Sequence, residues 1–194
     1  MDTLDGPEVL SFADASQWES WLADHHDERD GVWLRIAKKG SGARSVSVAE
    51  ALEVALCFGW IDSHRRSLDE SHFVQKYTPR RPRSSWSRVN TDRVDALIAA
   101  GRMREPGLAQ VAAAKADGRW DAAYASQRDA SVPPDLEAAL ESSDAAARTF
   151  GSLGKSGRYA LILRLLKART PEERAKRLGK IVVQLEDPTG VRGR

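Results

Sequence analysis

Apolar residues alternate along three short stretches in the first half of the chain. In residues 31–39, Val32, Leu34 and Ile36 alternate with their neighbours, and this period of two predicts a strand. Two further strands are predicted at residues 60–67 and 72–78, where the turn-like sequence LDES joins them. The pattern therefore indicates a β-hairpin and at least one more strand.

Between and after these strands, apolar residues recur with helical spacing. A capping box of Ser16 and Glu19 predicts the start of a first helix, and a second box of Ser47 and Glu50 predicts a helix that ends at Gly59. Two more helices are expected at residues 91–101 and 106–118, each closed by a glycine. The first half therefore combines helices with strands.

The second half shows helical spacing alone. After the paired prolines of residues 126–134, four helices are expected, at residues 134–143, 144–153, 156–169 and 170–185. We therefore expect an α+β fold with a small, mainly antiparallel sheet and helices, followed by a C-terminal all-helical subdomain. The expected organisation is an α+β domain at residues 1–125, a linker at 126–134 and the helical subdomain at 135–194.

Composition is that of a soluble globular protein, with 41% apolar and 30% charged residues among 194. No apolar run reaches the roughly 18–20 residues that span a bilayer, and the N-terminus lacks a targeting pattern, so a cytoplasmic protein without membrane insertion is expected. Cys57 is the single cysteine, which excludes an internal disulfide and a multi-cysteine metal site. Its apolar neighbours predict a buried side chain.

Positive charge is concentrated in one region that includes YTPRRPRSSWSRVN, residues 77–90. Between positions 64 and 93, eight basic and three acidic residues give a local net charge of +5, against +2 for the whole chain. Guanidinium groups match the geometry of phosphate and carboxylate, and Trp86 offers a plane for stacking. Two interpretations stay open: contact with an anionic partner, or a structural corner in which arginine stems cover tryptophan rings.

Asp62, Ser63 and His64 place an acid, a hydroxyl and an imidazole together. In a regular strand Asp62 and His64 share one face and Ser63 the other, which argues against a catalytic triad. Asp62, His64 and His72 could converge across the hairpin as a metal site, but this spacing is weakly specific. We therefore expect neither a metal nor a cofactor.

Four sequence strings resemble one bacterial family: CFGWIDS, YTPRRPRSSWSRVN, DRVDALIAAGRM and YALILRLLKARTPEERAKRL. The chain resembles the YdeI/OmpD-associated (OmdA-like, bacteriocin-protection) family from about Trp18 to Leu185, although its terminal helix carries a leucine where relatives have a tryptophan. The resemblance implies an association with resistance or stress and no particular reaction. The matching positions are Gly59, Trp60, Ile61, Asp62, Thr78, Pro79, Arg80, Pro82, Ser84, Trp86, Ser87 and Asn90.

The leading hypothesis is a non-catalytic protein that binds a small anionic or flat aromatic ligand in a cleft rimmed by the arginine and tryptophan side chains of residues 77–90. One alternative is an enzyme of unassigned class that uses Asp62 as general acid or base and Arg80 as electrostatic stabiliser. A second is single-stranded nucleic-acid binding, which the modest pI of about 8.8 disfavours. The expected ligand-binding residues are Trp60, Asp62, Arg80, Arg83, Trp86 and Asn90.

Overall fold

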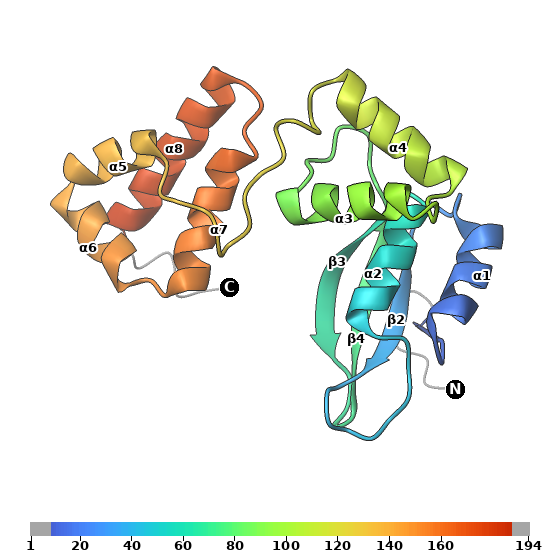
Figure 1. Cartoon of the computed structure of the whole chain (residues 1–194). Helices are drawn as coiled ribbons and strands as arrows, with labels where there is room; N and C mark the ends of the chain where they lie inside the picture. The colour runs from blue at the N-terminus through green and yellow to red at the C-terminus, as the bar shows by residue number, and fades with distance from the viewer. Residues whose placement is uncertain (1–8, 188–194) are drawn as a thin grey trace. The chain divides into compact units, whose positions relative to one another are not determined.

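The chain forms two compact units. Figure 1 shows the whole chain, coloured by residue number from the N-terminus to the C-terminus. The computed structural model describes residues 9–187. Within that range, unit 1 comprises residues 9–86 and 90–122, and unit 2 comprises residues 87–89 and 123–187. Whether residues 1–125 and 135–194 fold as separate domains joined by a linker stays a prediction.

Unit 1 contains a four-stranded sheet, with two helices between its strands and two after its last strand. The strands are β1 (Val9–Ser11), β2 (Val32–Ala37), β3 (Trp60–Ser67) and β4 (His72–Pro79), and the helices are α1 (Ala15–His25), α2 (Val48–Cys57), α3 (Arg88–Ala99) and α4 (Glu105–Ala116). The first two residues of α3 are grouped with unit 2. The predicted strands and helices are thus present in unit 1.

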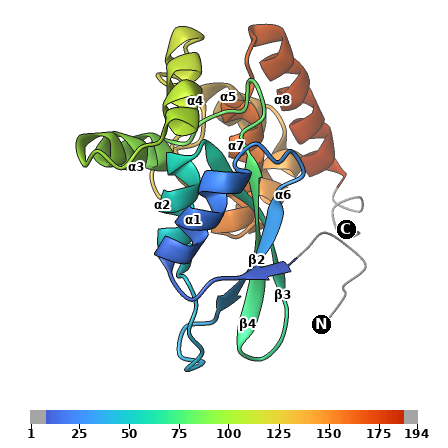
Figure 2. The ribbon, with the colours of Figure 1, turned by 90° about the vertical axis from the view of Figure 1, so that its right-hand side faces the viewer.

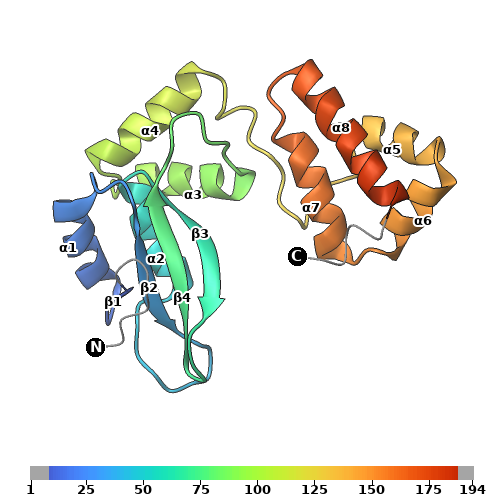
Figure 3. The same ribbon diagram turned by 180° about the vertical axis from the view of Figure 1, so that it is seen from behind.

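The sheet has the order β1-β2-β4-β3 and is mixed. β2 and β3 both pair antiparallel with β4, whereas β1 runs parallel to β2. The mainly antiparallel sheet is therefore confirmed, with β1 as a parallel edge strand that the pattern did not predict. Figure 2 shows β1 beside β2, and Figure 3 shows β2 and β4 from the side opposite α2.

The second predicted capping box is confirmed and the first is wrong. Ser47 accepts a hydrogen bond from the Glu50 amide, and the Glu50 carboxylate accepts one from the Ser47 amide. At α1 the cap is Asp14, whose carboxylate accepts from the Gln17 amide at 3.0 Å. Gln17 Oε1 in turn accepts a hydrogen bond from the Ala13 amide at 2.9 Å. Asp14 and Gln17 thus form the cap, and α1 begins two residues earlier than a cap at Ser16 would place it.

The core of unit 1 is aromatic. Trp18 lies 6.3 Å from Trp60 in an edge-to-face contact and 5.8 Å from Tyr77. The indole nitrogens of these two tryptophans donate to backbone carbonyls, Trp18 to Ala51 at 3.1 Å and Trp60 to His26 at 2.8 Å. These bonds fix the tryptophans between the sheet and α1, because a buried N–H without an acceptor is costly.

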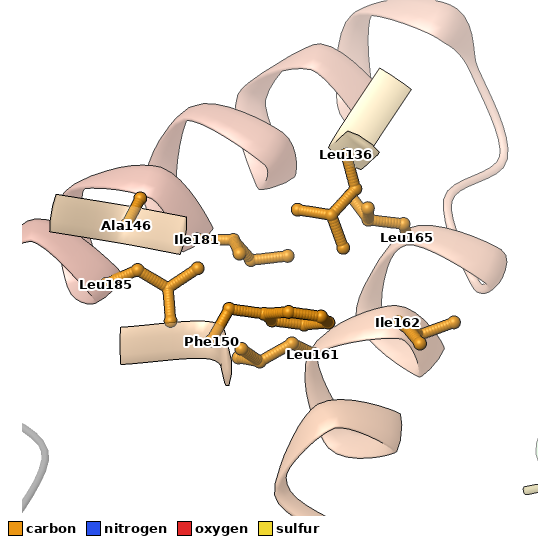
Figure 4. Close-up of a cluster of buried hydrophobic side chains, with 8 residues drawn as sticks. All are labelled: Leu136, Ala146, Phe150, Leu161, Ile162, Leu165, Ile181 and Leu185. Carbon is orange, nitrogen blue, oxygen red and sulfur yellow. The ribbon is translucent and has the colours of Figure 1, made fainter. Parts of the chain in front are cut away.

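Unit 2 consists of helices with an aliphatic core. Its helices are α5 (Pro134–Glu141), α6 (Asp144–Ser152), α7 (Lys155–Leu166) and α8 (Pro171–Glu186). Figure 4 shows the side chains that pack together, which are Leu136, Ala146, Phe150, Leu161, Ile162, Leu165, Ile181 and Leu185. With this unit, the predicted α+β class with a helical C-terminal part is confirmed. Among the described residues, no helix has the length and apolarity needed to cross a bilayer.

Candidate functional site

The arginine-rich segment begins where β4 ends, and its first arginine lies inside the protein. The Arg80 amide donates to the Gly59 carbonyl at 3.0 Å, which ties the segment to the end of α2. The Arg80 side chain is only 5% exposed, and its Cζ lies 3.4 Å from the centre of the Trp86 ring. This is a cation–π stack in a desolvated environment, where such contacts are strongest.

Neighbouring polar groups complete this stack. Arg80 Nη1 contacts the Ser84 hydroxyl at 3.5 Å and donates to the Ser85 carbonyl at 3.3 Å. Trp86, which is 2% exposed, packs against Trp120 with ring centres 4.9 Å apart. We call the assembly of Arg80, Ser84, Trp86 and Trp120 the Arg80 corner.

A second arginine joins the Arg80 corner to the residues that follow α4. Arg119 Nη1 donates to the Ser84 carbonyl at 3.0 Å, while its Nε pairs with the Asp117 carboxylate at 2.7 Å. Lys115 Nζ lies 5.1 Å from the Trp120 ring centre. Arg80 of the segment, and Lys115 and Arg119 outside it, therefore make contacts within unit 1, and for Arg80 this agrees with the structural interpretation.

Asp62 lies on β3 opposite Tyr77 of β4, and burial perturbs the ionisable groups of both side chains. Burial raises the pKa of the Asp62 carboxyl, and the positive charges of Arg65, Arg80 and Arg93 oppose that rise. The Tyr77 hydroxyl is buried without a hydrogen-bond partner in the part of the chain that the structure describes. Burial and the nearby Asp62 charge raise the pKa of this phenol.

The other expected ligand-binding residues are spread over different environments. Trp60 is fully buried in the aromatic core. Arg83 is exposed and has a φ of +65°, and Asn90 is half-buried in α3. Among the described residues, no ion pair joins Asp62 to Arg80. The structure thus brings Arg80 and Trp86 into contact and leaves Trp60 and Arg83 outside that contact.

The polar residues of the hairpin do not converge. The pairing of β3 with β4 shifts between Asp62 and Arg65, so the regular alternation assumed for Ser63 and His64 does not hold there, and both are exposed. His72 pairs with Ala37 five residues along β4 from the partner of Asp62, or about 16 Å at strand spacing. In the described ranges, no group of three His, Cys, Asp or Glu residues could hold a metal.

Unit 2 contains a cavity of about 610 Å³ that was not anticipated from the sequence. It lies between the first turns of α7 and residues 127–132, and we call it the Lys155 pocket. Its described lining residues include three cations and no acid: Arg128, Lys155, Arg158, Tyr159, Val132 and Ile162. The sequence signal is the spacing of Lys155, Arg158 and Tyr159, which share one helical face.

Hydrogen bonds shape this pocket from within unit 2. The Tyr159 hydroxyl donates to the Ala125 carbonyl at 3.0 Å, and Gln127 Nε2 donates to Ser156 Oγ at 3.2 Å. Arg158 Nε donates to the Leu153 carbonyl at 2.9 Å, which holds this guanidinium at the end of α6. Residues 125–127 are therefore fixed on α7, and the Lys155 and Arg128 side chains stay exposed.

Comparison with protein families assigns the two halves of the chain differently. Residues 129–187 match the family described as Bacteriocin-protection, YdeI or OmpD-Associated, which confirms the predicted resemblance for that part. Residues 10–110, which contain the FGWID and TPRRPRSSW strings, match a domain of unknown function, DUF8412.

Neither the curated proteins nor the solved structures include a match to this chain. The DUF8412 match spans 101 of 194 residues, more than half of the chain. The chain therefore belongs to the DUF8412 family, whose model matches residues 10–110, and residues 129–187 are similar to the family described as Bacteriocin-protection, YdeI or OmpD-Associated.

Proposed function

We propose that the protein is a non-catalytic binding protein that takes a small organic anion with a flat apolar body in the Lys155 pocket. The observation that carries this proposal is the combination of three cations with an apolar floor and no acid among the described lining residues. A volume of about 610 Å³ lies within the range of small-molecule sites. Most of the lining residues, though not Gln127 and Arg128, lie in the part that matches the bacteriocin-protection family.

The chemistry of the pocket favours binding over catalysis. Val132 and Ile162 offer apolar surface to a hydrophobic body, while Lys155 and Arg128 offer charge to an acid group at the rim. The nearest acid in sequence, Asp129, accepts a hydrogen bond from the Ser126 hydroxyl at 2.5 Å. No residue of the described lining pairs a nucleophile with a base.

The Arg80 corner is less suited to the same ligand, because its guanidinium and its indole ring are already stacked on each other. A ligand that used Trp86 as a platform would have to displace Arg80 from a desolvated contact. Arg83 remains available as an exposed cation on the same segment. The Arg80 corner, which the sequence predicted as the binding site, is therefore the alternative location of the ligand. The experiment below distinguishes it from the Lys155 pocket.

The proposal is tested by isothermal titration calorimetry, which measures the affinity of the full chain for 2-naphthoate. Lys155→Glu should weaken binding about tenfold, because it reverses a charge at the rim. Lys180→Glu is the matched control, since Lys180 is exposed on α8 and does not line the pocket. Neutral 2-naphthylmethanol should bind more weakly than the acid in the wild type and respond little to Lys155→Glu.

Two results would contradict this assignment. Equal affinities of the Lys155→Glu and Lys180→Glu variants for 2-naphthoate would show that the ligand does not bind in the Lys155 pocket. Loss of binding in Arg83→Ala together with unchanged binding in Lys155→Glu would place the ligand at the Arg80 corner instead.

A further inference from the structure

Unit 1 has a cavity of its own, away from the Arg80 corner, and its walls are rich in hydrogen-bond donors. The cavity has a volume of about 410 Å³. None of its described lining residues is acidic, and the polar ones are Ser11, Gln17, Arg35, Arg44, Ser45 and His72. We call it the Arg44 pocket.

The donors come from separate parts of the fold. Ser11 ends β1, Gln17 lies in the first turn of α1, and Arg35 is on β2 directly opposite Ser11. Arg44 lies in the connection between β2 and α2, and His72 begins β4. Figure 2 shows β1, β2 and α1 together on this side of unit 1. Donors therefore reach the cavity from several directions.

Several of these donors are not used within the protein. The Arg44 side chain is exposed and makes no hydrogen bond or ion pair with any residue that the structure describes. Gln17 accepts the Ala13 amide through Oε1, which leaves its NH₂ group to donate elsewhere. By contrast, the Ser45 hydroxyl already donates to the Val46 carbonyl and accepts from the Ala37 amide, so it shapes the wall.

One carboxylate lies beside the pocket, and it is largely satisfied by other groups. Asp69 accepts the backbone amides of Ser71 and His72 at 2.7 Å each. It lies 3.2 Å from His72 Nδ1 and 4.0 Å from Arg35 Nη2. At 4.0 Å the pair with Arg35 is loose, and the Arg35 side chain is 44% exposed. The same Nη2 lies 3.3 Å from His72 Nδ1, which leaves the other nitrogens of the Arg35 guanidinium as donors that can face a ligand.

We infer that the Arg44 pocket binds a tetrahedral oxyanion, the phosphate group of a small polar molecule. Two guanidinium groups supply the paired donors that such groups prefer. A planar carboxylate presents its two oxygens to one side, whereas a phosphate presents oxygens in several directions, which fits donors from β1, α1, β2 and β4. This site lies in unit 1 and is independent of the proposed Lys155 pocket.

Tryptophan fluorescence offers a readout confined to unit 1, because all six tryptophans lie there. Thermal unfolding of the full chain is followed with increasing inorganic phosphate, at constant ionic strength maintained with sodium chloride. Phosphate should raise the midpoint in a saturable way, as a ligand of the folded state does. Acetate at the same concentrations should have a much smaller effect.

Arg44→Gln should weaken phosphate binding about tenfold while leaving the midpoint without phosphate unchanged, since Arg44 has no internal contact to lose. The matched control is Arg29→Gln, an exposed arginine of unit 1 that does not line the pocket. Three results would overturn the inference: no saturable phosphate effect, equal affinities in the two variants, or acetate binding as tight as phosphate. Loss of the phosphate effect in Lys155→Glu, with Arg44→Gln unaffected, would also overturn it.

Discussion

The Arg80 corner and the Lys155 pocket are both rich in positive charge, but they use it in different ways. In the corner, Arg80 is stacked on Trp86 and Arg119 is paired with Asp117, so the charges serve internal contacts. In the pocket, Lys155 and Arg128 remain exposed above an apolar floor. A dense run of arginines along a sequence therefore does not by itself locate a binding site, because burial decides which charges are available.

The largest expected effect that tests this contrast is the removal of the stacked guanidinium. Arg80→Ala should lower the free energy of unfolding of unit 1 by about 2–4 kcal/mol, through loss of the cation–π contact, the hydrogen bonds and packed side-chain volume. Urea unfolding followed by tryptophan fluorescence measures this change. A loss below about 0.5 kcal/mol, the size of an ordinary surface effect, would show that the corner does not depend on Arg80.

A smaller effect is expected in unit 2, where one cation of the pocket also has an internal role. Arg158→Ala should destabilise unit 2 by about 1–2 kcal/mol, because Arg158 donates to carbonyls at the end of α6. Lys155→Ala should change stability by less than about 0.5 kcal/mol. Far-ultraviolet circular dichroism follows the helices, and tryptophan fluorescence serves as the unit 1 reference. Equal stabilities of the Arg158→Ala and Lys155→Ala variants would show that Arg158 stabilises unit 2 no more than Lys155 does.

The effect of pH on Asp62 tests whether its carboxyl is as poorly solvated as the structure indicates. Its pKa is raised in the folded chain, so its contribution to stability is present below about pH 4 and is lost as the pH rises through the folded value. Asp62→Asn should therefore gain stability relative to the wild type between about pH 4 and 7. Chemical unfolding across this range measures the difference.

Two other outcomes of the Asp62 experiment are informative. Parallel pH curves for the wild type and Asp62→Asn would mean that burial does not perturb the carboxyl. A variant that becomes less stable than the wild type as the pH rises would mean that the ionised form is needed by Arg65, Arg80 or Arg93, the cations that act on it.

The smallest expected effect concerns Arg83, the exposed arginine of the same segment. Its φ of +65° is a conformation that costs an L-residue about 1 kcal/mol, although glycine adopts it readily. Arg83→Gly should therefore be neutral or stabilise unit 1 by up to about 1 kcal/mol, since relief of strain competes with greater freedom of the unfolded chain. Arg83→Ala keeps the strain and is the control. Marked destabilisation by the glycine would reveal an internal role for this side chain.

The strands and helices with strong local signals could be predicted from the sequence. The Ser47 capping box, the hairpin of β3 and β4 and the proline start of α8 each follow from a few neighbouring residues. β1 was missed because three residues, Val9–Ser11, are too short to show a period, and their parallel pairing with β2 depends on tertiary contacts. The shifted pairing at Ser63 and His64 was missed because it, too, depends on how β3 meets β4 and not on the local sequence.

The site was harder to predict than the fold. The sequence indicated that residues 77–90 hold many arginines, but not that Arg80 is buried while Arg83 is exposed. Residues 126–134 were interpreted as a linker because of their prolines, so the pocket that residues 127–132 form with α7 was not expected. Arg128 is far in sequence from Lys155 and Arg158, and only the packing of this segment on α7 brings it to them.

The close packing of α4 on the end of α2 has a consequence for the only thiol of the chain. A Cβ at Gly107 would lie 2.1 Å from the Cys57 carbonyl oxygen, and the Arg104 amide donates to that same oxygen at 3.1 Å. Cys57 is 2% exposed, and burial raises the pKa of its thiol. Alkylating reagents can therefore reach this sulfur only when the two helices separate, so its labelling rate measures how often unit 1 opens at that seam.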